Sequence, residues 1–158
     1  MSSHRKAGLL HPVKKHAKRA DTPVLDDIRR LIRDKGLRGT PARLAVLRQL
    51  FGALGPMTHS QVADALSPQG FDKATIYRNL VDLADVGLLH RLELGDHVWR
   101  FELRQGAGDH THFLCVDCGD VSCVPDLSHK AAVTLVGERA ALGRVTEVVL
   151  KGHCKQCG

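Results

Sequence analysis

Four of the five cysteines form two Cys-x-x-Cys pairs, a spacing typical of metal ligands. The pairs are Cys115/Cys118 and Cys154/Cys157, and a glycine follows each one, so that backbone can approach the sulfurs closely. Each pair can present two thiolates to one tetrahedral Zn²⁺, at Zn–S distances of about 2.3 Å. Because four thiolates leave no open coordination position, we expect one structural zinc per chain, whose loss would unfold the C-terminal region. A redox-active dithiol is the alternative.

A second set of candidate ligands lies around the first cysteine pair. His110 and His112 are two residues apart, so on one strand they would face the same side, whereas Cys115 would face the other. Glu102 lies on the preceding expected strand, and the unpaired Cys123 lies on the following one. Together these side chains would form a mixed nitrogen, oxygen and sulfur site, which favours Zn²⁺ over Mn²⁺, with Fe²⁺ intermediate. The alternative is an exposed histidine pair beside a buried, inert cysteine.

The elements that must position these residues begin with helices. Apolar residues at helical spacing predict four helices in the first half of the chain. The first starts near Val24 and ends at Gly36, and Thr40, Thr58 and Asp72 are expected to cap the next three.

After residue 87 the pattern changes to that of strands. Residues 88–94 and 97–103 flank Gly95-Asp96, which predicts a β-hairpin with a tight turn. The other expected elements are strands at 112–116, 121–124 and 145–150 and a helix at 127–142. Short helices followed by a hairpin outline a winged helix-turn-helix, which is a DNA-binding architecture. The predicted fold class is therefore α+β: an N-terminal winged helix-turn-helix domain followed by a small α/β dimerisation domain with the four-cysteine site.

Charge and composition divide the chain further. It has 23 basic and 17 acidic residues, and six of the basic ones lie in residues 1–20, which contain no acid. We expect 1–20 to be a disordered basic tail that contacts DNA phosphates or is merely solvated. Residues 21–91 are predicted to be the winged-helix domain, with its hairpin extending to about 103. Residues 92–158 are predicted to be the α/β dimerisation and metal-binding domain.

The fourth helix has side chains suited to reading DNA. Ile76 and Leu80 are expected to face the core, since they are four residues apart. The residues left near the exposed N-terminal end are Lys73, Thr75, Tyr77, Arg78 and Asn79. Arginine can bind guanine or phosphate, asparagine can pair with adenine, and tyrosine or threonine can contact phosphate or thymine. The alternative is a solvated amphipathic helix.

Several classes of protein are not expected. The 158 residues are 43% hydrophobic, enough for a core, but no apolar run is long enough to span a membrane. Since no secretory signal is recognisable, we expect a soluble, cytoplasmic protein that does not bind membranes. A zinc enzyme is the alternative of another class, yet neither a deaminase pattern nor His-Glu-x-x-His is present. We therefore expect no enzyme activity and no small-molecule substrate.

Taken together, these motifs resemble the ferric uptake regulator (Fur) family of metal-dependent bacterial repressors. The resemblance covers residues 37–157, most of the chain. The motifs that carry it are, in order, Arg38-Gly-Thr-Pro-Ala-Arg43, Ala74-Thr-Ile-Tyr-Arg-Asn-Leu80, Arg100-Phe-Glu-Leu103, His110-x-His-x-x-Cys115-x-x-Cys118 and His153-Cys-x-x-Cys157.

The resemblance implies a homodimer whose C-terminal halves pair. It also implies a sensory metal between the domains, which fixes the arrangement that binds a double-stranded DNA operator. By position, Glu102, His110 and His112 match sensory ligands, and the four paired cysteines match the structural zinc site.

The same resemblance assigns residues to the DNA. Tyr77 and Arg78 match positions that contact DNA in the family. We also expect Arg38 and Arg43, from the motif at the start of the second helix, to contact it.

The chain departs from the family pattern in the sensory site. A sensory histidine of the family aligns near Pro56, which cannot bind a metal, and His59 is the candidate substitute. Cys123 stands where iron and peroxide sensors usually have a carboxylate, which favours zinc.

The function predicted is a metal-responsive transcriptional repressor of metal-homeostasis genes, with Zn²⁺ slightly favoured as the effector. An iron- or manganese-dependent regulator or a peroxide sensor of the same family is the first alternative. A zinc-ribbon adaptor that binds no DNA is another.

Overall fold

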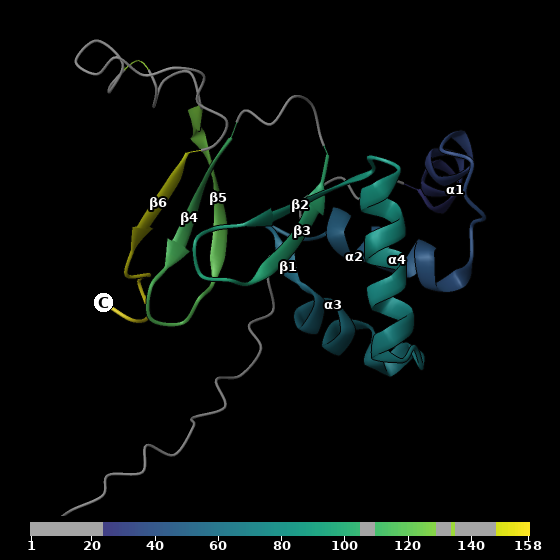
Figure 1. Cartoon of the computed structure of the whole chain (residues 1–158), viewed down its shortest axis with the longest axis horizontal. Coiled ribbons are helices and arrows are strands. Elements are labelled where there is room, and N and C mark those ends of the chain that lie inside the picture. The colour runs from purple at the N-terminus through teal and green to yellow at the C-terminus, as the bar shows by residue number, and fades with distance from the viewer. Residues whose placement is uncertain (1–23, 105–109, 129–133, 135–147) are drawn as a thin grey trace, which may run out of the picture.

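The computed structural model describes residues 24–104, 110–128, 134 and 148–158, with the backbone alone at 110 and 125–128. The predicted tail at 1–20 lies outside these residues. Within the described parts, the helices lie on one side, a second sheet lies on the other, and the hairpin lies between them (Figure 1). No helix in those parts is long and apolar enough to cross a membrane.

The helices begin where the sequence predicts caps. The side chains of Thr40, Thr58 and Asp72 each accept a hydrogen bond from the backbone N–H three residues on, at 3.3, 3.1 and 2.8 Å. Gln61 completes a capping box by accepting a hydrogen bond from the N–H of Thr58. The three predicted caps are therefore confirmed. The helices are α1 (Leu25–Asp34), α2 (Pro41–Phe51), α3 (His59–Leu66), the short 3₁₀ helix η1 (Ser67–Gln69) and α4 (Lys73–Asp85).

The first core lies between these helices and the first sheet. Ile76 and Leu80 of α4 are fully buried in it, as the four-residue spacing predicts. Ile28 and Ile32 of α1 are fully buried as well, and Phe101 of the hairpin closes the core from the sheet side. The N-terminal end of α4 is thereby held against α2 and α3 with its outer face uncovered.

The first sheet contains the predicted hairpin. Strands β1 (Met57–Thr58), β2 (Leu89–Glu93) and β3 (Trp99–Leu103) pair antiparallel in the order β1-β3-β2. The hairpin of β2 and β3 is confirmed. Strand β1 is absent from the sequence prediction because two residues are too few to show a period.

The turn of the hairpin is wider than predicted. Pairing ends at Glu93 and Trp99, which leaves a loop of five residues. In this loop Leu94 is buried against the second sheet, and Asp96 accepts hydrogen bonds from Arg100 at 2.9 and 2.7 Å. Both contacts are made by residues that do not pair between the two strands. The predicted tight turn at residues 95 and 96 is therefore wrong.

The second sheet is mixed. Strands β4 (His110–Cys115), β5 (Val121–Ser128) and β6 (Val149–Gly152) lie in the order β5-β4-β6, with β4 antiparallel to β5 and parallel to β6. The helix predicted at 127–142 starts too early, because 127 and 128 belong to β5; of the rest only Thr134, which is helical, is described. The predicted strand at 145–150 is observed at 149–152, and 145–147 lie outside the described residues.

The hairpin contributes to both cores. Leu92 and Leu94 pack with Leu114 and Val121 of the second sheet, whereas Phe101 packs in the first core. The domain boundary near 91 stays a prediction.

A buried arginine adds a polar link between the two regions. Arg100 is 2% exposed, and its guanidinium pairs with Asp96 and donates to the carbonyl of Gly119 at 2.9 Å. Gly119 directly follows the first cysteine turn, so the hairpin is tied to that turn.

Candidate metal centres and nucleic-acid interface

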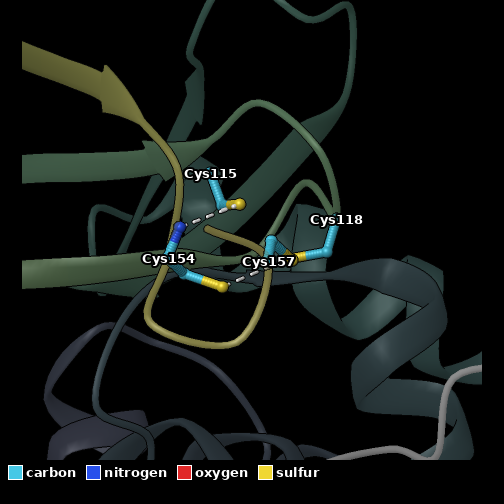
Figure 2. Close-up of side chains that lie close together, drawn as sticks. All are labelled: Cys115, Cys118, Cys154 and Cys157. Carbon is cyan, nitrogen blue, oxygen red and sulfur yellow. Dashed lines mark hydrogen bonds between the residues drawn. The ribbon is translucent and has the colours of Figure 1, made fainter.

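The four paired cysteines come together at one end of the second sheet. Cys115 ends β4 and Cys118 lies in the turn after it, while Cys154 and Cys157 lie in the turn after β6. Because β4 and β6 run parallel, with Cys115 opposite Gly152, the two turns emerge side by side. Their sulfurs lie within 4.8 Å of one another, and Figure 2 shows the four side chains grouped together.

This geometry fits a tetrahedral zinc. Cys118 Sγ and Cys154 Sγ are 3.9 Å apart, and two sulfurs of a tetrahedral site with Zn–S of about 2.3 Å are separated by about 3.8 Å. The N–H of Cys154 points at Cys115 Sγ at 3.4 Å, which is the backbone contact that sulfur ligands commonly receive. All four cysteines are free thiols, so the sulfurs are available as ligands.

The pKa values of the four-cysteine group favour binding of a cation. Backbone N–H groups of Cys118 and Cys154 lower the pKa of Cys115 to about 6. A hydrogen bond to Cys154 and burial raise the pKa of Cys157 to about 12. Backbone hydrogen bonds thus favour the thiolate form of Cys115, whereas Cys157 beside it keeps its proton. A doubly charged metal would remove the repulsion between neighbouring thiolates and hold all four sulfurs as thiolates.

Three predicted sensory ligands form a second group. Glu102 of β3, His112 of β4 and Cys123 of β5 place ligand atoms within 4.8 Å of one another. His112 and Cys123 are direct partners across the ladder of β4 and β5. His112 Nε2 lies 3.1 Å from Glu102 Oε2, and His112 is only 4% exposed. We call these three residues the mixed-ligand cluster.

The cluster holds a positive charge even without metal. Burial lowers the pKa of His112, but hydrogen bonds to Cys123 and Glu102 outweigh it and raise that pKa to about 9. At neutral pH the imidazole is therefore protonated between a carboxylate and a thiol. This proton occupies the place that a divalent cation would take.

His90 is a candidate ligand that the sequence analysis missed. It lies opposite Glu102 in the hairpin, with its Nδ1 3.6 Å from Glu102 Oε1. The tight turn expected at residues 95 and 96 would have paired His90 with Phe101 instead. A slip of one residue moves a side chain to the other face of a sheet. The sequence alone did not give the length of the hairpin loop, because contacts with the second sheet determine that length.

Two other predicted ligands are His59, which lies outside the cluster, and His110, whose side chain is not described. His59, the candidate substitute for a ligand at Pro56, points at α4: its Nε2 lies 2.9 Å from the carbonyl oxygen of Lys73. Its ring meets that of Tyr77 edge-on, with centroids 5.4 Å apart. In this arrangement His59 faces α4 and lies outside the mixed-ligand cluster, and its binding of the sensory metal stays a prediction. The His110 side chain lies outside the described part of the structure, so its place in the sensory site stays a prediction.

The outer face of α4 keeps part of the predicted DNA-binding set. Lys73 and Arg78 are exposed, and Tyr77 is 45% exposed. Thr75 is half-buried, and its hydroxyl donates to Asp72 at 2.6 Å.

Asn79 and Arg43 do not face solvent. Asn79 is 8% exposed, and its amide donates to the carbonyl of Thr75 at 2.8 Å. The Arg43 side chain is 11% exposed, donates to the carbonyl of Arg38 at 2.7 Å and forms an ion pair with Asp82 of α4. In this arrangement both side chains are held by protein partners that helical spacing alone did not reveal, so their predicted DNA contacts stay predictions. Arg38 is exposed, as a DNA contact requires.

Comparison with known proteins agrees with this architecture. The model of the ferric uptake regulator family matches residues 34–136. The peroxide-responsive repressor PerR of Staphylococcus aureus (strain Mu50) is 36% identical over 92 residues, which span 57% of this chain and 61% of that protein. The Vibrio cholerae ferric uptake regulator is 25% identical with a TM-score of 0.63, over 80% of this chain and 98% of that one. The Pseudomonas aeruginosa ferric uptake regulator with manganese is 29% identical with a TM-score of 0.57, over 81% and 98%. Because the family model matches residues 34–136, more than half of the chain, the protein belongs to the ferric uptake regulator family.

Proposed function

We propose that the protein is a metal-responsive transcriptional repressor that binds a double-stranded DNA operator as a homodimer. The observation that carries this proposal is the mixed-ligand cluster. Glu102 belongs to the sheet that closes the first core, whereas His112 and Cys123 belong to the second sheet. A divalent ion held by all three would join the two regions.

Two metals per chain are proposed, with different roles. Cys115, Cys118, Cys154 and Cys157 would hold one structural Zn²⁺. The mixed-ligand cluster would hold the regulatory ion. His90 lies against Glu102 but outside the group of atoms within 4.8 Å of one another, so it would have to move closer to act as the fourth donor. Two imidazoles, a carboxylate and a thiolate favour Zn²⁺ over Mn²⁺, with Fe²⁺ intermediate.

The regulatory step is a shift between conformations. Binding of a divalent ion requires His112 to lose its proton and Cys123 to be a thiolate. With these groups held to Glu102, the hairpin and the second sheet keep the arrangement described here. If operator DNA selects the same arrangement, metal tightens DNA binding and DNA tightens metal binding by the same factor.

The DNA would meet the exposed side of α4. Lys73 and Arg78 supply positive charge for phosphates or guanine, and Tyr77 supplies a ring for a base methyl or a phosphate. Arg38 lies exposed ahead of α2. Loss of affinity in Arg78→Ala would support this face, whereas unchanged affinity would favour an adaptor that binds no DNA.

The test starts with selection of an operator from random DNA. Fluorescence anisotropy then measures affinity for chelated protein, with Zn²⁺, Mn²⁺ or anaerobic Fe²⁺ added back singly and metal per chain counted. Recovery with a second Zn²⁺ per chain supports a zinc-responsive repressor. Recovery of DNA binding with Fe²⁺ or Mn²⁺ but not with Zn²⁺ would identify one of those metals as the effector. If no metal changed DNA binding, the proposal would be refuted.

A peroxide-responsive repressor is the second candidate, favoured by the 36% identity to the Staphylococcus aureus protein. It predicts that peroxide adds oxygen to His110 or His112 in the iron-loaded protein. Mass spectrometry of a zinc regulator would show no such change at either histidine.

A further inference from the structure

The loop between α2 and β1 touches the second sheet backbone to backbone. A Cβ atom placed on Gly55 would lie 2.8 Å from the carbonyl oxygen of Val121, 3.2 Å from Cα of Ser122 and 3.4 Å from N of Cys123. All three are backbone atoms of β5, so a side chain at position 55 cannot displace them without moving the strand. Glycine is required here by the close approach and not by its φ, because it is not among the glycines with positive φ.

This contact lies between the two regions and beside the mixed-ligand cluster. On one side, Met57, two residues after Gly55, is buried in the first core. On the other side, Val121 is buried in the second core, and Cys123 belongs to the cluster. The stretch of β5 that meets Gly55 therefore carries one of the proposed metal ligands.

The loop itself offers no ligand at this point. Pro56 has no side-chain donor atom, and His59 is engaged with α4. The described residues of the cluster come from the hairpin and the second sheet. Because this loop supplies no ligand, it can respond to the state of the cluster only through packing, and Gly55 packs on the stretch of β5 that carries Cys123.

Resting on the function proposed above, we propose that Gly55 couples the mixed-ligand cluster to the DNA-binding helices. When Cys123 is held in the cluster, residues 121–123 are fixed in the position on which Gly55 packs. The loop then sets where α2 and β1 lie relative to the second sheet, and with them the presented face of α4. Gly55 is a positioning residue in this scheme, and it touches neither metal nor DNA.

The test uses the full-length protein with its structural zinc in place and the variant Gly55→Ala. Anisotropy measures operator affinity with and without Zn²⁺, and a competing chromogenic chelator measures zinc affinity with and without DNA. In the wild type we expect each ligand to tighten the other by roughly 5- to 150-fold. In Gly55→Ala we expect the second zinc still to bind, but both ratios to fall close to one.

Gly52→Ala is the matched control, because it lies in the same loop and its added Cβ would meet only ordinary contacts at 3.6 and 3.7 Å. It should keep the wild-type ratios. Wild-type ratios in Gly55→Ala would overturn the inference, and so would loss of the second zinc, which would mean that Gly55 shapes the site instead. Failure of the proposed function is distinguishable, because the wild type would then show no zinc-dependent DNA binding at all.

A measurement on the wild type avoids any folding defect of the variant. Hydrogen exchange with and without Zn²⁺, at constant structural zinc, should show slower exchange in residues 121–123 and also in residues 55–58. Protection confined to 121–123 would refute the coupling through Gly55.

Discussion

A proton and a metal compete for His112. Hydrogen bonds to Cys123 and Glu102 raise its pKa to about 9 against the effect of burial. In the metal-free fold, protonation of His112 therefore stabilises the native state. That stabilisation is complete below about pH 6.5, the value expected for an unfolded histidine, and is lost as the pH rises through about 9.

Metal binding should show the opposite trend. We expect zinc affinity of the mixed-ligand cluster to rise by up to about tenfold per pH unit between pH 6.5 and 9 from this proton alone, and to level off above that. Chelator competition across the pH range measures it, together with proton release in weak buffer at pH 7.5. A zinc affinity independent of pH between 6.5 and 8 would contradict the assignment of His112.

The contacts of His59 indicate a structural role in place of the expected metal ligation, and this role can be tested. Its ring contacts Tyr77 and its Nε2 lies on the carbonyl of Lys73, so it braces the first turns of α4. We expect His59→Ala to weaken operator binding by about two- to twelvefold, as loss of an aromatic contact of 0.5–1.5 kcal/mol predicts. Zinc binding should not change. Ser60→Ala, at the exposed neighbouring position on α3, is the control, and a loss of zinc from His59→Ala would restore His59 as a ligand.

Arg38 and Arg43 were both expected to contact DNA, but Arg38 is exposed whereas Arg43 is buried in an ion pair. Arg43 joins the start of α2 to Asp82 of α4. Arg43→Ala therefore removes one partner of the Arg38 carbonyl and of the Asp82 carboxylate. We expect the free energy of unfolding in urea to fall by about 1–2 kcal/mol. Arg38→Ala should leave stability unchanged and weaken DNA binding. The reverse pattern would contradict the corrected assignment.

At the scale of elements, local signals were sufficient for the helices and insufficient for the hairpin. Thr40, Thr58 and Asp72 cap helices through hydrogen bonds that span only three residues, so the sequence carries all the information. The hairpin loop instead depends on Leu94 and Arg100, whose contacts lie in another sheet and another turn. A one-residue error in register followed, and with it the omission of a possible ligand.

The corrected register gives its own prediction. His90 faces Glu102 across the hairpin, so His90→Ala should weaken binding of the second zinc by roughly tenfold or more, since even loss of an outer-shell partner costs about 10- to 100-fold in metal affinity. The structural zinc should stay bound. Arg91→Ala is the control, since Arg91 lies on the neighbouring position and stacks on Trp99 instead. Equal zinc affinity in His90→Ala and the wild type would remove His90 from the site and leave the fourth position to another donor.

At the scale of the whole molecule, the two regions differ in what stabilises them. The first core buries sixteen residues from the four α-helices, the loop after α2 and the first sheet. The second core buries four, two of them from the hairpin, among the residues that the structure describes. The first core is large enough to stabilise the helical region by hydrophobic burial. The second sheet has a candidate metal site as a further source of stability, because a zinc bound by the two Cys-x-x-Cys pairs would add its binding free energy to folding.

Loss of the structural zinc should therefore unfold one end of the protein and spare the other. β6 contributes four residues and pairs with β4, and the turn after it places two sulfurs beside the two of the first cysteine turn. We expect Cys157→Ser to abolish hydrogen-exchange protection in 149–158 and in β4 while α2 and α4 stay protected. Gln156→Ala, in the same turn but not a sulfur ligand, should behave like the wild type. Because the mixed-ligand cluster uses β4 and β5, the same variant should also lose the second zinc, which makes the structural metal a precondition for sensing. Full protection of β4 in the zinc-free variant would show that the second sheet is held by packing alone.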